Sequence, residues 1–535
     1  MNFISTITFF GFIALVAVIS WWKARGTNLS ATTGYFLAGR SLGWYVIAAS
    51  LILTNISTEQ LIGLNGNAFL HGASVMAWET VAAVAMVAMA LFFLPRYLKS
   101  GITTIPQFLE MRFGKNVRTI VSLMFLVALT LSFLPFVLYS GAIGMNNLFN
   151  VSGLLGVSER ASLWIMIIAL GLAGVAYTIV GGLKAAAVSD GVNGVGLVIG
   201  GFLIPVLGLW KLGDGSFYEA FRIMTQNRPE MLSPVGGPES SVPFSTLFTG
   251  MLIINLFYWC TNQMIVQRTL AAKNLAEGQK GVLFAAFLKI LGIGILVLPG
   301  IIAWHLHAQG KITVSHQDVA YPVLVANVLP SWMTGFFGAV MFGAILSSFN
   351  GGLNSVTTLF SVDCYKNVLH KNATERETVA AGRIFGLALV VLCILIAPEI
   401  ANAPDGLYTL MRKLMAFFNI PILAIILLGV LSKRATALSV YIAVPIGILF
   451  YGWFGFYKNG VFFSNPVHWL HVAGINLLLI LMIMFFIRLL KPAAEKYVQK
   501  YTGEVDLTFW KGAKISGAAV ILLVVLLYWG LTLIA

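Results

Sequence analysis

The stretch "LTNISTEQLIG" (residues 53–63) decides how the rest of the chain is interpreted, because it places a polar run inside an apolar one. It is preceded by "YVIAASLI" and followed by "LNGNAFL". Inside a bilayer every polar group needs a partner, so such a run is costly unless it lines a cavity. The stretch therefore predicts a membrane helix that is interrupted at a binding site.

The composition is that of a helical membrane protein. Of the 535 residues, 59% are hydrophobic and only 10% are charged, whereas soluble domains carry about 25% charged residues. The apolar stretches have the length of a membrane helix, and they lack the alternation of barrel strands. The three cysteines show no spacing typical of a metal site. We therefore predict an all-α integral membrane protein.

We predict fourteen membrane-spanning helices from the apolar segments. Their approximate ranges are 4–22, 43–69, 74–95, 119–148, 161–180, 186–210, 246–263, 281–306, 332–361, 378–398, 406–431, 436–455, 467–487 and 515–534.

The basic residues indicate how these helices are oriented. Most of the 33 lysines and arginines fall in alternate connections, and only a few lie in the others: Arg160, Lys211, Arg222, Arg228, Lys311 and Lys458. By the positive-inside rule the connections rich in lysine and arginine are cytoplasmic, which puts both termini outside. The net charge of +14 is then an orientation signal, and no nucleic-acid partner is expected. We predict a multi-pass plasma-membrane protein, of the bacterial inner membrane.

A second polar interruption is predicted in the seventh segment, which contains Asn255, Thr261, Asn262 and Gln263. It is five segments after the first interruption, so the two segments run in opposite directions. Discontinuous helices at matching positions of two inverted halves indicate a midplane site in a secondary transporter. The expected division is a first peripheral helix and loop (1–42), a first inverted repeat (43–212), an external loop (213–245), a second inverted repeat (246–435) and three peripheral helices with a cytoplasmic link (436–535).

Several motifs resemble those of the sodium/solute symporter family, in its sodium/sugar branch, and are most similar to bacterial sodium/galactose symporters. They are "ISTEQLIG" (56–63), "TIVGGLKAAAVSD" (178–190), "FYWCTNQMIVQRTLAAKNLAEGQKG" (257–281), "FAAFLKILGIGILVLPGI" (284–301) and "GAILSSFNGGLNSVTTLFSVDCYK" (343–366). The resemblance implies fourteen helices with a LeuT-like core of two inverted five-helix repeats, whose first helices are discontinuous. It also implies Na⁺ as the coupling ion.

For the sodium site the resemblance implies backbone carbonyls of Leu53, Ile56 and Ala344, with the hydroxyls of Ser347 and Ser348. A hard monovalent cation needs several oxygen ligands, and an unwound helix frees carbonyls to supply them.

Asp190 lies near the inner end of its helix, where the resemblance implies a second sodium site or an exit path. The alternative is an acid that is paired with a nearby lysine such as Lys184.

For the solute the resemblance implies amides and charges around a sugar ring, an aromatic inner gate and an outer lid. Sugar hydroxyls both donate and accept, so such groups suit them. The substrate residues are Gln60, Glu79, Asn255, Lys289 and Asn55, with Tyr258 as the gate, and the lid residues are Leu64, Trp78 and Tyr408.

Glu79 and Lys289 stand out without any resemblance, because each is a charge inside an apolar segment. Each must face protein or water and find a partner. A purely structural ion pair, with each other or with Glu59, is the alternative, and the two interpretations are compatible.

Arg412 departs from the sugar-transporter pattern, which has a glutamine at the aligned position on its eleventh helix, and Ala82 replaces a serine. A guanidinium in the cavity would suit a carboxylate. The alternative is that Arg412 and Lys413 point to water at the outer end of the helix.

The predicted function is sodium-coupled symport of a galactose- or glucose-like monosaccharide by alternating access. Sodium symport of a sugar acid or another anionic solute is the first alternative. A solute-gated sensor on the same fold is the second. Scattered histidines and the lack of a nucleophile elbow argue against an enzyme.

Overall fold

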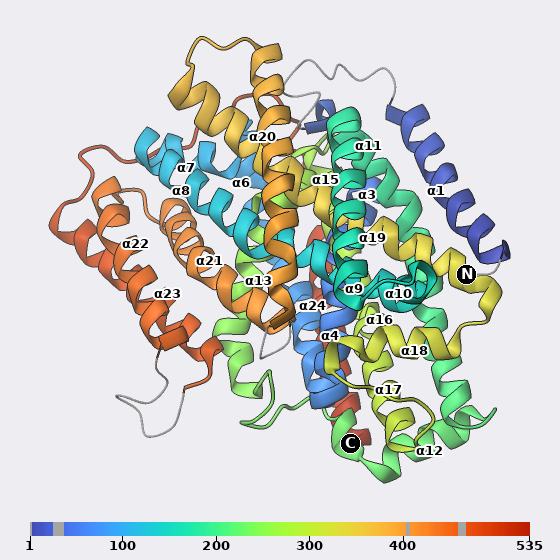
Figure 1. Ribbon diagram of the computed structural model, residues 1–535. Coiled ribbons are helices and arrows are strands. Elements are labelled where there is room, and N and C mark those ends of the chain that lie inside the picture. The colour runs from blue at the N-terminus through green and yellow to red at the C-terminus, as the bar shows by residue number, and fades with distance from the viewer. Residues whose placement is uncertain (1–2, 25–36, 403–406, 458–466) are drawn as a thin grey trace.

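The computed structural model describes residues 3–24, 37–402, 407–457 and 467–535 (Figure 1), and over 176–187 it describes the backbone alone. All the regular secondary structure of the described residues is helical, and irregular loops join the helices. The only β-type pairing of the described residues is one isolated parallel bridge between Leu42 and Ala272. The predicted all-α class is therefore confirmed.

The first half of the chain forms helices that cover the first six predicted segments. They are α1 (Phe3–Ala24), η1 (Ala38–Arg40), α3 (Trp44–Asn55), α4 (Thr58–His71), η2 (Gly72–Met76), α5 (Ala77–Ala88), η3 (Met89–Phe93), α6 (Leu94–Lys99), α7 (Ile105–Phe113), α8 (Lys115–Ala128), η4 (Leu129–Phe133), α9 (Leu134–Phe149), α10 (Val151–Leu155), α11 (Glu159–Leu212), α12 (Phe217–Asn227) and η5 (Pro229–Leu232).

The second half of the chain forms helices that cover the other eight predicted segments. Its helices are η6 (Phe244–Phe248), α13 (Gly250–Cys260), α14 (Gln263–Leu270), α15 (Leu275–Leu291), α16 (Ile293–Leu296), α17 (Leu298–Ala308), η7 (Gln317–Val319), α18 (Ala320–Val328), α19 (Ser331–Thr358), η8 (Leu359–Leu369), α20 (Glu375–Ile396), η9 (Ala397–Asn402), α21 (Leu407–Leu431), α22 (Ala437–Gly452), η10 (Trp453–Tyr457), α23 (Trp469–Leu490) and α24 (Ala513–Ile534).

Fewer helices meet the length and apolarity of a membrane span than the fourteen predicted. Among the described residues, 9 helices are long and apolar enough to span a bilayer, or 10 with one bent pair, and three shorter apolar helices accompany them. One assigned helix, α11, runs through both segments that were expected at 161–180 and 186–210. The count of fourteen therefore stays a prediction.

The interruption that "LTNISTEQLIG" predicts lies between α3 and α4. Ile56 (φ −79°, ψ 80°) and Ser57 (φ −111°, ψ −176°) leave the helical region, and the helix resumes at Thr58. Ser57 N donates to Asn55 O at 3.0 Å, and Gln60 N donates to Ser57 O at 3.1 Å. These short-range bonds replace the helical ladder over two residues, so the discontinuous helix is confirmed.

The matching interruption in the seventh segment separates α13 from α14 at Thr261 and Asn262. Asn262 caps the new helix, because its side-chain oxygen accepts from Met264 N at 3.1 Å. The two broken helices also meet at one end. There Leu42 N donates to Ala271 O at 3.0 Å, and Lys273 N donates to Leu42 O at 3.2 Å.

A third irregular helix is bent by 44° between α15 and the α16–α17 pair. Asn65 of α4 supports the bend: its amide nitrogen donates to Ile295 O at 3.1 Å, and its oxygen accepts from Gly300 N at 2.9 Å. The side chain thus satisfies backbone groups that the bend releases, which apolar surroundings require. Lys289, one turn before the bend, is held at the centre of the protein as a result.

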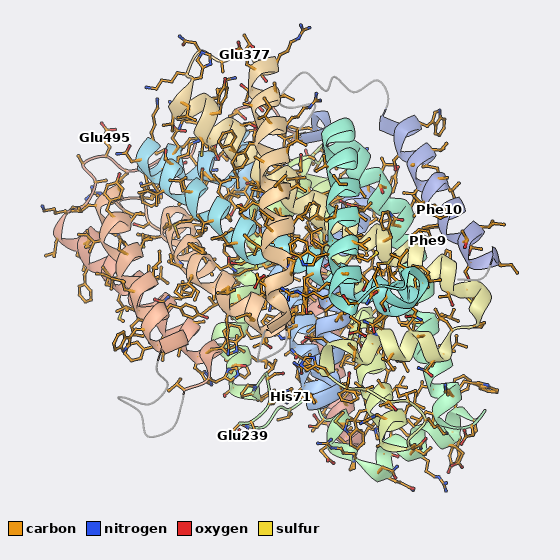
Figure 2. The ribbon with its side chains drawn as sticks, viewed as in Figure 1. Phe9, Phe10, His71, Glu239, Glu377 and Glu495 are labelled. Atoms are coloured by element: carbon orange, nitrogen blue, oxygen red, sulfur yellow. The ribbon has the colours of Figure 1, made fainter. Side chains whose placement is uncertain are left out.

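The connections that alternate in charge lie at opposite ends of the molecule. Figure 2 shows Glu377 and Glu495, from two connections predicted to be cytoplasmic, at one end, whereas His71 and Glu239 lie at the other. The loop 213–245, which was predicted to be external, contains the short helix α12, whose Phe217, Tyr218 and Phe221 are exposed. The relative sidedness of the loops agrees with the charge pattern.

Candidate sodium and solute sites

The break between α3 and α4 releases two of the carbonyls expected to bind sodium. In a continuous helix Leu53 O would accept from Ser57 N and Ile56 O from Gln60 N. Both donors turn elsewhere, to Asn55 O and Ser57 O. Leu53 and Ile56 are buried, so their oxygens lie in a dry environment without their helical donors. This is the arrangement that a desolvated cation needs.

Helix α19 brings the other predicted ligands to the same junction. The Ser348 hydroxyl donates to Thr54 O at 2.9 Å, which ties α19 to the last turn of α3. Ala344 lies one turn earlier on α19, and Ser347 lies beside the Asp190 carboxylate. Of the α19 residues predicted as sodium ligands, Ser348 contacts α3 next to the break, and the full set of five stays a prediction.

Two further oxygens at this junction belong to the polar run that follows Leu53 but were not among the predicted sodium ligands. Among the described residues, the hydroxyls of Thr54 and Ser57 are buried and have no hydrogen-bond partner. An unpartnered buried hydroxyl is unfavourable, which makes these groups additional oxygen donors for a cation. The polar run alone was the signal that could have identified them.

Asp190 lies in a buried network next to the junction. Its carboxylate accepts from the Ser50 hydroxyl at 2.7 Å and pairs with Arg268 at 3.5 Å, and Arg268 Nε donates to Ser50 at 2.8 Å. Asp190 and Arg268 are each 1% exposed. The expected alternative, an ion-paired acid, is present with Arg268 as its partner, whereas the Lys184 side chain lies outside the described residues.

Glu79 of α5 and Lys289 of α15 form an ion pair at the centre of the protein, and both side chains are fully buried. The Lys289 ammonium also donates to Asn55 Oδ1 at 2.5 Å and lies 5.7 Å from the centre of the Trp259 ring. The partner of each charge is thus the other predicted residue. Lys289 links this pair to the last residue of α3, next to the break.

Arg412 of α21 points into the protein, not to water, and is 6% exposed. Its guanidinium lies over three aromatic rings, at 5.3 Å from Trp78, 5.3 Å from Tyr258 and 4.8 Å from Tyr408. It also donates to the Tyr408 hydroxyl at 2.8 Å and interacts electrostatically with Glu59. One side chain therefore joins the predicted outer lid to the predicted inner gate.

Two of the three predicted lid residues contact each other, and the third is buried in the neighbouring helix α4. The rings of Trp78 and Tyr408 meet edge to face at 5.5 Å, and Leu64 is fully buried. Gly63 allows α4 to approach α21, because a Cβ at this position would lie 2.5 Å from Tyr408 Cβ. These contacts bring α4, α5 and α21 together at the residues predicted to form the outer lid.

A cavity of about 480 Å³ lies on the other side of the lid. Trp469 of α23 lies between this cavity and the lid. It lines the cavity, and its ring stacks on that of Trp78 with a centroid distance of 6.5 Å. Asn67, His71, Thr409 and Lys413 also line the cavity. It forms an approach to the lid from the end of the molecule where His71 lies.

Gln60 and Asn255, the remaining predicted substrate residues, are both buried. The Asn255 amide nitrogen donates to Met251 O at 3.0 Å, within its own helix. Gln60 interacts with the Tyr408 hydroxyl, while its amide oxygen has no hydrogen-bond partner. Both residues come from broken helices, as the two interruptions predicted.

Two broken helices that meet at a buried polar centre define a secondary transporter. The Sodium:solute symporter family matches residues 35–447, and the chain belongs to this family. It is a membrane protein of many spans with Na⁺ as the coupling ion of solute transport.

Among its relatives, an "Uncharacterized symporter YidK" of Escherichia coli (strain K12) is 48% identical over 99% of this chain and 91% of that protein. A "Sodium/glucose cotransporter" of Vibrio parahaemolyticus is 32% identical over 84% of each. A solved Na⁺-coupled sialic acid symporter, in a substrate-bound outward-open state, matches with a TM-score of 0.78 over 93% of this chain and all of that one, at 18% identity. This last likeness confirms the LeuT-like fold.

Proposed function

We propose that this protein carries a neutral monosaccharide of the galactose or glucose kind into the cell together with sodium. One observation supports a sugar above other solutes: buried acceptor atoms without donors surround the centre. They are one carboxylate oxygen each of Glu59 and Glu79 and the amide oxygen of Gln60. Sugar hydroxyls supply the missing donors. A sugar acid carries such hydroxyls too, so this observation favours a sugar ring, and the charges of the centre separate the two candidates.

The charges of the centre support the same choice. Glu79 pairs with Lys289, and Glu59 interacts electrostatically with Arg412, so each of the two cations has an acid of the protein near it. Arg412 is therefore already compensated by an acid of the protein. A solute carboxylate would add an uncompensated buried charge, which is costly. A similar relative carries the name of a glucose cotransporter.

A sugar acid is the second candidate, because Arg412 faces the centre and its Nε atom has no hydrogen-bond partner there. Guanidinium binds carboxylates through two parallel hydrogen bonds. For this solute Arg412 would have to leave Glu59 and the three rings.

In this proposal the two halves 43–212 and 246–435 are inverted repeats, 1–42 and 436–535 are peripheral, and 213–245 is external. Both termini lie outside the bacterial inner membrane. Sodium binds Leu53, Ile56, Ala344, Ser347 and Ser348, and Asp190 lies on its path to the cytoplasm. Gln60, Glu79, Asn255, Lys289 and Asn55 bind the sugar, Tyr258 closes the inner side, and Leu64, Trp78 and Tyr408 close the outer side.

Sodium matters in this cycle because it binds one conformation better than the other. It joins the broken helix to α19, and inward opening would separate these ligands. One charge that crosses 100 mV gains about 2.3 kcal/mol, and a tenfold sodium gradient adds about 1.4 kcal/mol. Together these energies allow a one-to-one symporter to concentrate its solute on the order of 500-fold.

Uptake into proteoliposomes tests the proposal. Labelled galactose, glucose and glucuronate are supplied with and without an inward sodium gradient. We expect a neutral hexose to accumulate only with sodium. Accumulation of glucuronate alone would contradict the neutral solute and favour the second candidate. If none of the three accumulates although one binds, the sensor replaces the symporter.

Replacing Ser348 with alanine should weaken sodium coupling. The substitution removes one proposed ligand and the hydrogen bond to Thr54 O. We expect the half-saturating sodium concentration for uptake to rise about tenfold, the equivalent of one hydrogen bond. The measurement is the sodium dependence of hexose uptake.

Ser361→Ala is the matched control, because the Ser361 hydroxyl donates to Thr357 O within its own helix, away from the junction. Its sodium dependence should stay within about twofold of that of the unmodified protein. Equal effects of the two substitutions would exclude Ser348 from the sodium site.

A further inference from the structure

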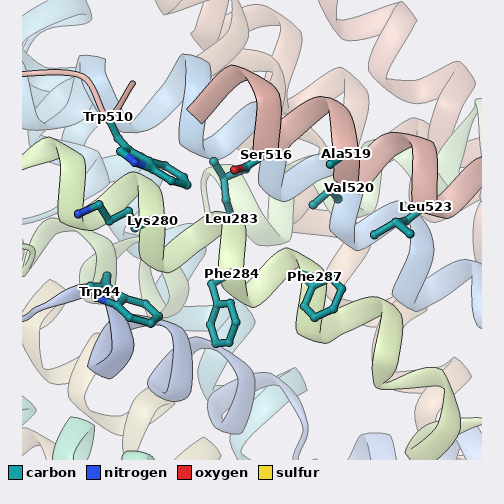
Figure 3. A pocket seen from close by; sticks show the side chains of 10 residues that line it. All are labelled: Trp44, Lys280, Leu283, Phe284, Phe287, Trp510, Ser516, Ala519, Val520 and Leu523. Atoms are coloured by element: carbon teal, nitrogen blue, oxygen red, sulfur yellow. The ribbon is translucent and has the colours of Figure 1, made fainter. Parts of the chain in front are cut away.

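A groove on the membrane-facing surface lies between α15 and α24, apart from the sodium and solute sites (Figure 3). Its volume is about 380 Å³, within the roughly 300–1,000 Å³ of small-molecule sites. Phe284 and Phe287 of α15 form one wall, and Ser516, Ala519 and Val520 form the other. Small residues on α24 thus face large rings on α15, which leaves a channel between the helices.

The two ends of the groove differ in chemistry. Figure 3 shows Trp44, Lys280 and Trp510 together at one end, and Phe287 and Leu523 at the other. Indole rings and lysine ammonium groups are typical of the level of lipid headgroups, whereas apolar rings suit acyl chains. The groove therefore has the polarity of a phospholipid along its length.

The headgroup end is a built structure and not a gap between mobile side chains. Trp44 N donates to the Glu277 carboxylate at 3.0 Å, and Trp510 N donates to the Gln279 amide oxygen at 2.9 Å. Gln279 is fully buried and donates to Ala90 O at 3.1 Å. Glu277 and Gln279 of α15 therefore fix the backbone at both tryptophans, which come from distant parts of the chain.

The charge at this end is positive. Lys280 pairs with Glu277 at 3.2 Å, yet its side chain is 36% exposed. Lys273 also interacts with Glu277, so two lysines face one carboxylate. The remaining positive charge lies where a lipid phosphate would reach the groove, which favours an anionic headgroup.

We propose that one anionic phospholipid occupies this groove, with an acyl chain between α15 and α24 and its phosphate at Lys280. The lipid bridges the peripheral helix α24 to α15, which carries Lys289, and to Trp44, the first residue of α3. Its occupancy then stabilises the arrangement of the two helices that hold the transport sites. Transport should depend on this lipid.

Native mass spectrometry of the purified full chain tests the binding. The probes are dioleoylphosphatidylglycerol and dioleoylphosphatidylcholine, added in equal amounts. We expect the unmodified protein to retain one phosphatidylglycerol in preference to phosphatidylcholine. In Lys280→Gln this preference should be about fivefold smaller, which is the contribution of one lysine near an anionic surface. Equal retention of the two lipids by the unmodified protein would overturn the proposal.

Ala519→Trp fills the groove from the α24 side and should abolish the retained lipid. Val525→Trp places the same side chain on the same helix, at a position that does not line the groove and is 58% exposed. It should retain the lipid. Loss of the lipid in both variants, or in neither, would overturn the assignment of the groove.

Sodium-driven uptake adds a second measurement. The unmodified protein and Val525→Trp should transport several-fold faster when phosphatidylglycerol is added to phosphatidylcholine vesicles, and Ala519→Trp should not respond. An equal response of all three would contradict the functional role. Lipid retention needs no transport, so the binding result is independent of the solute that the protein carries.

Discussion

Replacing Lys289 with methionine should abolish solute uptake. The change leaves the Glu79 carboxylate fully buried without its cation. Breaking a buried pair in this way costs about 3–5 kcal/mol, so we expect uptake to fall more than about 100-fold. The measurements are hexose uptake in proteoliposomes and the yield of monodisperse protein after purification.

The double variant Glu79→Gln with Lys289→Met separates the two interpretations of the pair. Removing both charges should restore the yield of folded protein, since no unpaired charge remains. Uptake should stay low if the pair also binds the sugar. Recovery of uptake to within about twofold would show that the pair is only structural.

Lys366→Met is the matched control for this experiment. Lys366 of η8 pairs at 2.8 Å with Glu375, the first residue of α20, and both side chains are more than a third exposed. Exposed pairs contribute about 0–1 kcal/mol. The control should therefore leave yield and uptake almost unchanged.

Replacing Arg412 with glutamine should have the second largest effect. The substitution leaves Glu59 without a buried cation and removes the charge that three aromatic rings share. A desolvated cation–π contact contributes about 2 kcal/mol, so we expect the KM for a neutral hexose to rise about 30-fold. The measurement is the concentration dependence of hexose and glucuronate uptake.

Two further variants show what Arg412 does. Glu59→Gln with Arg412→Gln removes the carboxylate that Arg412→Gln leaves without its cation but does not restore the cation–π contacts, so its hexose KM should stay within about threefold of that of Arg412→Gln. Arg412→Lys should fall between the glutamine variant and the unmodified protein, because lysine keeps the charge but loses the planar group. If Arg412→Gln removes glucuronate uptake and leaves hexose uptake unchanged, Arg412 binds a solute carboxylate and the neutral proposal is wrong.

Local sequence was sufficient to locate the breaks in the core helices. The polar run after Leu53 and the one at Thr261–Gln263 both coincide with interruptions in the structure. Neighbouring residues decide where these breaks fall, because an apolar membrane helix tolerates such a polar run only where its hydrogen-bond ladder is interrupted. The same reasoning identified Glu79 and Lys289 as buried charges.

Sequence was not sufficient to choose partners. Asp190 pairs with Arg268, although Lys184 is much closer along the chain. Arg268 itself is buried, whereas the charge pattern had placed it with the cytoplasmic loops. The bend after Lys289 and its support by Asn65 were not anticipated either.

By itself the sequence determined that this is a helical membrane protein, that two of its helices are broken, and which polar residues lie within them. Hydrophobic length and local polarity decide these properties, and both can be read from neighbouring residues. The tertiary structure alone decided that Arg412 faces inward, that Glu79 meets Lys289, and that α15 and α24 leave a groove. These properties depend on contacts between residues far apart in the chain, because a buried charge takes the partner that packing brings to it.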